Sequence, residues 1–283
     1  MLYFVKDKIP KDLLEYFEPA ECGRCYICKL VEVFREVKRT LKDDGTLWLN
    51  LGDSYFSSGT NMDRNWDGRE KNFSKGKPMM NLHHDILKQK DLIGIPWRVA
   101  FALQADGWWL RQDIIWHKPN PMPESVTDRC TKSHEYIFLL AKNQKYYFDN
   151  EVIMENAVEL YSEKRAKRPI TSHGKEPTPS GNSNNLTYNK LRPNNKRNKR
   201  SVWTITTKPY KEAHFATYPP ELVTPCVLAG SREGDVVLDP FIGSGTTAFV
   251  AKKLGRQYLG IELNPKYVDM ANKRLTQLQE RLL

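Results

Sequence analysis

Two glycines and two carboxylates near the C-terminus have the spacing of a nucleoside-binding site. The apolar run 236–238 predicts a buried strand, and Asp239, Gly243 and Gly245 follow it in a loop. Glycines let the backbone turn tightly and approach a ligand, whose groups then meet free N–H groups where a helix begins. Glu262 ends the next predicted strand, where a carboxylate can accept hydrogen bonds from ribose hydroxyls. This order of strand, loop, helix, strand and acid predicts a ligand-binding βαβ unit.

The loop differs from the two common phosphate-binding loops. It has neither the Gly-x-Gly-x-x-Gly pattern of dinucleotide sites nor the Lys-Ser/Thr pair of a P-loop. Asp239 stands at the end of the strand instead, where an acid suits a cationic ligand better than a pyrophosphate. The residues therefore favour a nucleoside that carries a positive charge and an amino group, and S-adenosylmethionine is the first candidate.

Several segments, taken together and in order, resemble the motifs of bacterial and phage site-specific DNA methyltransferases that modify adenine N6 or cytosine N4. These segments are 239–247 (motif I), 260–267 (motif II), 214–219 (motif X), and 46–55 and 113–120 (downstream sheet motifs). The resemblance runs from about Leu30 to the C-terminus and implies S-adenosylmethionine as cofactor. It implies that the cofactor-binding residues are Asp239, Pro240, Phe241, Gly243, Ser244, Gly245, Thr246, Glu262, Leu263, Asn264, His214, Phe215 and Ala216.

The resemblance also implies the fold class. We expect an α/β, Rossmann-like methyltransferase fold with a mostly parallel sheet, helices on both faces and an inserted target-recognition segment. Motif I follows the other sheet motifs, which is the order of the permuted beta class. The expected parts are the first part of the sheet (1–150), a basic recognition segment (151–202) and the cofactor-binding part of the same domain (203–283).

Hydrophobic periodicity and turn residues predict the individual elements. The predicted helices are 28–42, 96–106, 246–254 and 265–282. The predicted strands are 46–51, 108–117, 135–142, 144–148, 236–238 and 257–262, with 135–142 and 144–148 forming a hairpin around Asn143.

The positive charge of the chain is concentrated in one segment. The net charge is +10, and 161–200 alone holds eleven Lys and Arg against two Glu. Charge by itself leaves a polyanion partner and a solvated loop equally open. The resemblance implies a reader of double-stranded DNA, with an RNA methyltransferase as an alternative. The candidate DNA-binding residues are Lys118, Asn120, Arg165, Lys167, Arg168, Lys196, Arg197, Lys199 and Arg200.

The catalytic tetrapeptide of this family, Asp/Asn/Ser-Pro-Pro-Tyr/Phe/Trp, is absent from the sequence. Its side-chain and backbone oxygens accept the amino hydrogens of the target, and its aromatic ring stacks on the flipped base. We expect either that the natural chain starts upstream of Met1, which is slightly favoured, or that the protein binds DNA or cofactor without turnover. Asp53 and Tyr55, after the strand 46–51, are candidate catalytic residues that a strand-end turn explains equally well. The other sheet motifs resemble branches that methylate cytosine N4.

Cysteine content and hydropathy bound the remaining possibilities. Cys22, Cys25 and Cys28 have the spacing of a zinc knuckle, but no fourth ligand is near, so plain thiols are the default and no metal is predicted. Five cysteines form no disulfide framework, which favours a reducing interior. The resemblance to bacterial and phage enzymes implies a cytoplasmic protein with a bacterial or phage gene. No apolar run approaches the ~20 residues of a membrane span. A homodimer and a cognate restriction enzyme stay open as partners.

Overall fold

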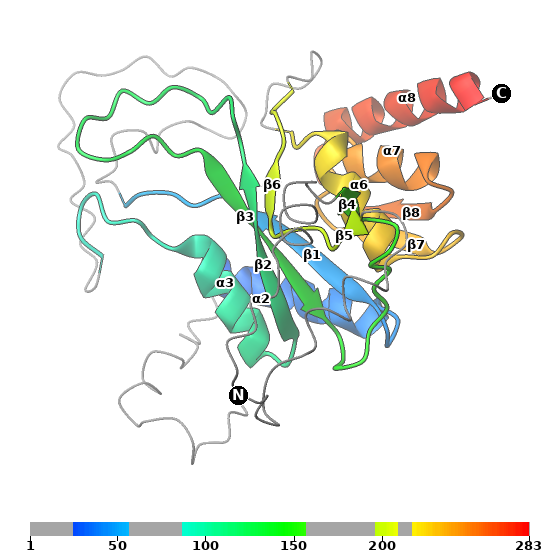
Figure 1. The fold of residues 1–283 in the computed structure, drawn as a ribbon, viewed down its shortest axis with the longest axis horizontal. Coiled ribbons are helices and arrows are strands. Elements are labelled where there is room, and N and C mark those ends of the chain that lie inside the picture. The colour runs from blue at the N-terminus through cyan, green and yellow to red at the C-terminus, as the bar shows by residue number, and fades with distance from the viewer. Residues whose placement is uncertain (1–24, 57–86, 157–195, 209–216, 283) are drawn as a thin grey trace, which may run out of the picture. The chain divides into compact units, whose positions relative to one another are not determined.

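The computed structural model describes residues 25–56, 87–156, 196–208 and 217–282 (Figure 1). The chain divides into two compact units. The first is Met1–Tyr146 with Val202–Thr207, and the second is Tyr147–Ser201 with Lys208–Leu283. Both units combine helices with strands, which confirms the predicted α/β class. Within the described ranges, none of the helices has the length and apolar character that crossing a membrane requires.

The first unit is built on a four-stranded sheet. Its strands are β1 (Thr46–Leu51), β3 (His134–Ala141), β2 (Trp109–His117) and β6 (Val202–Thr204), in that spatial order. β3 runs antiparallel to both β1 and β2, and only β2 and β6 are parallel. The expectation of a mostly parallel sheet is therefore wrong for this sheet. β2 returns as its neighbour β3 through a loop, and such a return without a crossover helix produces antiparallel strands.

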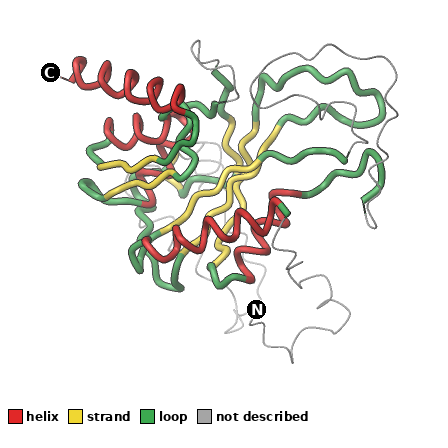
Figure 2. The backbone as a smooth tube through the Cα atoms, turned by 180° about the vertical axis from the view of Figure 1, so that it is seen from behind, coloured by secondary structure: helices red, strands yellow, loops and turns green. Residues whose placement is uncertain are grey.

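Two helices cover one face of this sheet (Figure 2). They are α2 (Tyr26–Thr40) and α3 (Ile95–Ala105), and they pack against each other. The ring of Trp97 lies 5.0 Å from that of Phe138 and 5.7 Å from that of Tyr136, edge to face in both cases. Phe138 and Leu103 are fully buried. Aromatic and aliphatic side chains thus fasten α3 to β3 and make this face the core of the unit.

The second unit contains the predicted βαβ element. β7 (Val236–Asp239) pairs in parallel with β8 (Gln257–Gly260), and α7 (Thr246–Lys253) connects them. α7 packs against α6 (Pro220–Gly230) on one side and α8 (Pro265–Leu282) on the other. Two short strands, β4 (Glu155–Asn156) and β5 (Lys196–Arg197), form a separate antiparallel pair. Sequence reasoning found every member of the βαβ element and missed α6.

The predicted strand 144–148 is wrong. Both edges of β3 are already paired, one with β1 and the other with β2, so a hairpin partner has no edge to join. The chain after β3 turns back towards β1 instead. The amide of Lys142 donates to the carbonyl of Gly45 at 3.2 Å, and Asn143 Nδ2 donates to the carbonyl of Asp43 at 2.9 Å. The predicted boundaries 1–150, 151–202 and 203–283 stay predictions, because most of the basic segment lies outside the described residues.

Candidate functional site

The loop between β7 and α7 contains two glycines, Gly243 and Gly245, whose surroundings differ. Gly243 has φ +51° and Gly245 has φ +78°, both in the left-handed region that side chains disfavour. A Cβ on Gly245 would lie 2.8 Å from the Cβ of Ala271 in α8, so helix packing excludes any side chain there. A Cβ on Gly243 would meet nothing closer than 4.0 Å. The loop is therefore packed at Gly245 and open at Gly243.

A carboxylate holds the open part of the loop in place. Glu262 lies two residues beyond β8, and its Oε2 accepts a hydrogen bond from the amide of Gly243 at 3.0 Å. Its Oε1 accepts one from the amide of Asn264 at 2.8 Å. Each carboxylate oxygen has a further lone pair, so the half-buried group keeps acceptor capacity for a ligand. The adjoining apolar side chains, Leu263 and Phe241, are 95% and 55% exposed.

Asp239 holds the loop from its other end. Its Oδ1 accepts from the amide of Phe241 at 3.0 Å, and its Oδ2 accepts from the hydroxyls of Thr247 at 2.5 Å and Tyr218 at 3.0 Å. Burial first, and the charge of Asp239 second, raise the pKa of the Tyr218 phenol. The contacts give Asp239 a structural role, and its predicted contact with a cationic ligand stays a prediction. Sequence reasoning did not single out Tyr218, although this residue lies within the segment 214–219 that resembles motif X.

Two other predicted cofactor residues face helix α8. Ser244 and Thr246 are 6% and 3% exposed. Arg274 Nη1 donates to Thr246 Oγ1 at 2.9 Å, and the same guanidinium lies 4.9 Å from the ring centre of Phe249. The same Arg274 Nη1 also donates to the backbone carbonyl of Ser244 at 3.4 Å. Burial and the contacts with Arg274 therefore give both residues a structural role, and their contact with the cofactor stays a prediction. The predicted residues His214, Phe215 and Ala216 lie outside the described residues.

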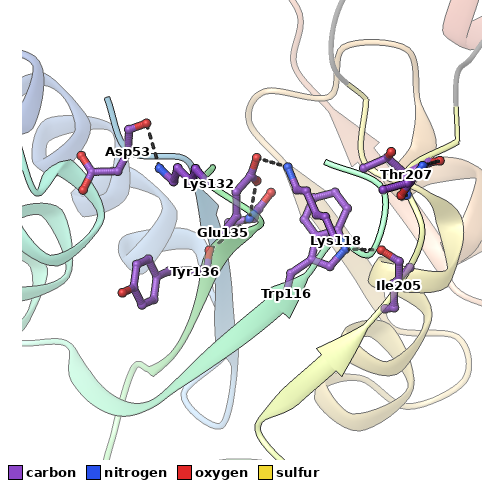
Figure 3. Close-up of polar contacts among 10 residues, drawn as sticks. Asp53, Trp116, Lys118, Lys132, Glu135, Tyr136, Ile205 and Thr207 are labelled. Carbon is purple, nitrogen blue, oxygen red and sulfur yellow. Dashed lines mark hydrogen bonds and ion pairs between the residues drawn. The ribbon is translucent and has the colours of Figure 1, made fainter. Parts of the chain in front are cut away.

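A second set of polar residues lies at one end of the four-stranded sheet, where β1 and β2 end and β3 begins (Figure 3). Lys118, which follows β2, forms an ion pair with Glu135 at the start of β3. Its Nζ also lies 4.2 Å from the ring centre of Trp116. Asn50 Nδ2, from β1, donates to Glu135 Oε2 at 3.2 Å. The predicted DNA contact Lys118 is thus engaged inside the unit. Sequence reasoning predicted neither its ion pair with Glu135 nor the hydrogen bond between Glu135 and Asn50.

The second predicted DNA contact of this region is tied to the segment after β6. Asn120 Nδ2 donates to the carbonyl of Thr207 at 3.1 Å, and the amide of Thr207 donates to Asn120 Oδ1 at 3.0 Å. The side-chain amide thereby imitates a backbone partner, and it fixes the start of the loop between β2 and β3. Contact of Asn120 with DNA stays a prediction.

The two candidate catalytic residues have structural partners as well. Asp53 Oδ1 accepts from the amides of Gly94 and Ile95, both at 3.0 Å, so it caps the start of α3. The backbone carbonyl of Asp53 accepts from Lys132 Nζ at 2.9 Å (Figure 3), and desolvation lowers the pKa of this lysine. The guanidinium of Arg129 lies 4.0 Å from the ring centre of Tyr55. A catalytic role for either residue stays a prediction.

Comparison with known proteins identifies the family. Residues 23–273 match the family model of the DNA methylases, in the class that methylates amino groups at N6 or N4. The chain belongs to this family. It is 49% identical over 251 residues to the Type II methyltransferase M.SmaI of Serratia marcescens, a match that covers 88% of this chain and 74% of that protein. It is 48% identical over 250 residues to M.Cfr9I of Citrobacter freundii, covering 88% and 71%.

Solved structures agree on the fold of this DNA methylase. The PvuII DNA methyltransferase, which is cytosine-N4-specific, matches with a TM-score of 0.54 and 16% identity, covering 92% of this chain and 78% of that one. The complex of M1.HpyAVI with SAM matches with a TM-score of 0.50 and 18% identity, covering 87% and 82%. At these identities the likeness establishes the fold alone, and it confirms the methyltransferase fold that the motifs predict.

The described end of the basic segment of the methylase is held by one acid. Arg197 Nε and Arg200 Nε donate to the same Glu155 oxygen, at 3.0 and 2.8 Å. Burial acts to raise the pKa of Glu155, but the hydrogen bonds and charges of the two arginines lower it overall. Lys196 is exposed. Other predicted DNA contacts, Arg165, Lys167 and Arg168, lie outside the described residues.

One cysteine of the methylase, Cys25, caps the N-terminus of helix α2. Cys25 Sγ accepts from the amide of Cys28 at 3.5 Å at the start of α2, and the two sulfurs are 3.3 Å apart. Cys22 lies outside the described residues. Across the described ranges, no three His, Cys, Asp or Glu side chains gather in a way that could hold a metal ion.

Proposed function

We propose that this DNA methylase binds S-adenosylmethionine over Gly243 and methylates cytosine N4 at a specific sequence in double-stranded DNA. The hydrogen bond from the Gly243 amide to Glu262 Oε2 carries the proposal. It keeps a carboxylate at the carboxyl edge of two parallel strands, where open α/β sheets bind nucleosides.

The residues around Gly243 fit this cofactor. The open side of the loop accepts a group in van der Waals contact, and the free lone pairs of Glu262 suit the two ribose hydroxyls. The exposed side chains of Phe241 and Leu263 offer apolar surface to a purine ring. When bound, the sulfonium supplies an electrophilic methyl group for direct displacement by the amino nitrogen.

The protein must then make the amino nitrogen of the target nucleophilic. Its lone pair is delocalised into the ring, so acceptors placed at the amino hydrogens lower the barrier. The family tetrapeptide that provides them is absent from the printed sequence, and we assign these acceptors to no residue. Asp53 stays a candidate, although its Oδ1 already accepts from the amides of Gly94 and Ile95 at the start of α3.

The basic segment between β4 and β6 contacts the phosphates and base edges of the DNA. Its described end combines the exposed Lys196 with Arg197 and Arg200, whose guanidinium groups Glu155 holds in place. Lysine and arginine neutralise phosphates, and arginine also reads guanine edges. The DNA methylase family favours this interpretation over an RNA substrate.

Methyl transfer from labelled S-adenosylmethionine to plasmid DNA tests the proposal directly. The DNA is digested to nucleosides, which are separated and identified by mass spectrometry. We expect N4-methylcytosine, and N6-methyladenine would move the target to adenine. Absence of label from all DNA would contradict the activity of this chain. Glu262→Ala serves as the matched variant, because a defective cofactor site must remove the label as well.

The partners outside DNA follow from the Type II naming of the relatives. We propose that the protein acts in the cytoplasm of a bacterium and protects its DNA from a restriction enzyme of the same specificity. DNA from cells that express the protein should resist one member of a panel of restriction enzymes. A homodimer stays a prediction, for which molar mass by light scattering is the measurement.

A further inference from the structure

One exposed apolar side chain stands out in the loop 118–133, which connects β2 to β3. Met122 is 87% exposed, more than any other large hydrophobic residue in the described part of the first unit. Figure 1 shows this loop extending well beyond the ends of the two strands. A single exposed hydrophobic residue is common and by itself indicates nothing. The setting of Met122 is what distinguishes it.

The backbone presents Met122 in a restricted conformation. Pro121 and Pro123 flank it, and each proline fixes its own φ and keeps the preceding residue out of the helical region. Asn120 and Met122 are therefore both confined to extended conformations. The backbone of such a segment therefore loses little conformational entropy when the Met122 side chain enters a binding partner.

Anchors on both sides hold the loop in position. At its base, the amide of Lys118 donates to the carbonyl of Ser133 at 2.7 Å. Before Met122, the Asn120 side chain exchanges two hydrogen bonds with Thr207. After it, Glu124 forms an ion pair with Arg129.

The second half of the loop is tied to the chain before α3. Arg129 stacks on the ring of Tyr55 at 4.0 Å, and Asp128 forms an ion pair with Lys90 at 2.7 Å. Lys132 Nζ donates to the carbonyl of Asp53. These contacts hold the loop 118–133 in one conformation, although it contains no helix or strand. We call this loop the arm.

The chemistry of the proposed function requires an opened duplex, which such an arm can stabilise. An exocyclic amino group inside a duplex can be methylated only after its nucleotide leaves the base stack, at a cost of a few kcal/mol. Proteins that distort duplexes insert apolar wedges, methionine among them, between base steps. The arm also starts at the end of the sheet where β1, β2 and β3 place the polar cluster of Lys118, Glu135 and Asn50.

We propose that Met122 enters the DNA duplex at the target and fills the space that the flipped base leaves. This role rests on the proposed function, because it applies only to methylation of a paired base. The wedge stabilises the open duplex and has no part in cofactor binding or methyl transfer itself.

The test compares paired and unpaired targets. The methylated site of the wild-type protein is first located by sequencing its product, and two duplexes are then made, one fully paired and one with a mismatch opposite the target base. Single-turnover methylation is measured for the wild-type protein, Met122→Ala, Met122→Leu and Val126→Ala. Val126 is the matched control, since it is an apolar residue of the same loop with 36% exposure.

We expect Met122→Ala to slow methylation of the paired duplex by about ten-fold or more, because part of the unpairing free energy is no longer offset. The mismatched duplex should recover most of the rate, since its target is already unpaired. Met122→Leu and Val126→Ala should stay near the wild type on both duplexes.

Two results would contradict the proposed insertion of Met122 and leave the proposed function unaffected. One is an unchanged rate of Met122→Ala on the paired duplex, and the other is an equal loss on both duplexes. A wild-type protein that methylates no duplex would overturn the proposed function, and the wedge with it. Thermal unfolding of each variant shows that the comparison is made between folded proteins.

Discussion

Glu262 accepts a hydrogen bond from the amide of Gly243 at 3.0 Å and thereby joins the end of β8 to the glycine loop after β7. The two residues are 19 positions apart, yet they form one feature of the site, a carboxylate beside an open loop. The same carboxylate also caps the turn into α8 through the amide of Asn264. Removing the Glu262 carboxylate should therefore weaken ligand binding and also loosen the glycine loop.

Glu262→Ala should weaken binding of S-adenosylmethionine by about 1.5–3 kcal/mol, the value of a hydrogen bond to a charged group. Isothermal calorimetry measures the affinity. Glu262→Gln is the control, because it keeps one oxygen acceptor and should lose less. Unchanged affinity of a folded alanine variant would remove Glu262 from the cofactor site.

Gly245→Ala should lower the free energy of unfolding by about 2 kcal/mol or more, since it combines left-handed backbone strain with overpacking against Ala271. Gly243→Ala, with nothing closer than 4.0 Å, should cost only the strain of about 1–2 kcal/mol. Urea unfolding separates the two variants. Equal destabilisation would show that the packing of Gly245 on α8 matters less than the geometry indicates.

The buried phenol of Tyr218 predicts a pH dependence at the alkaline end. Its pKa is raised above the ordinary 10.0, so the folded state keeps the proton while the unfolded state loses it. The stabilisation from Tyr218 is complete below pH 10 and declines above it, by about 1.4 kcal/mol per pH unit. Urea unfolding of the wild type and Tyr218→Phe between pH 9 and 11.5 isolates this contribution. Parallel curves for the two proteins would contradict it.

Asp53 permits a test that separates capping from catalysis. Asp53→Ala should reduce stability by about 0.5–2 kcal/mol, because the first amides of α3 lose their acceptor. Asp53→Asn keeps an oxygen in place and should retain most of the stability and the methylation rate. A folded asparagine variant with a large loss of rate would favour the catalytic interpretation of this carboxylate.

The basic segment predicts the salt dependence of DNA binding. If Lys196 and Lys199 each neutralise one phosphate, replacing both by alanine should make the slope of log K against log salt shallower by about 1.8. Fluorescence anisotropy with a labelled duplex at several salt concentrations gives this slope. Lys253→Ala, an exposed lysine at the end of α7, is the control. An unchanged slope in the double variant would place the phosphate contacts elsewhere.

Local sequence patterns predicted the elements around the cofactor loop well. The order of β7, α7, β8 and α8 follows from hydrophobic runs, two glycines and a proline, all of which act over a few residues. The same patterns placed β1 correctly, at 46–51. They failed for 144–148, whose apolar run resembles a strand but finds both edges of β3 occupied. Strand pairing is a property of the sheet, and periodicity within one segment cannot specify it.

The sequence by itself determined the βαβ unit, the acid beside the glycine loop and the family of the chain. The tertiary structure decided what each polar side chain contacts. Lys118 appears as a DNA contact in the sequence, yet the register of β3 against β2 and β1 brings it to Glu135, 17 residues away, and Glu135 to Asn50, 85 residues away. Asp53 likewise meets the start of α3 across 41 positions. Contacts of this range depend on how strands and helices pack together, because a charged or polar group inside a fold takes the nearest partner that offsets its desolvation.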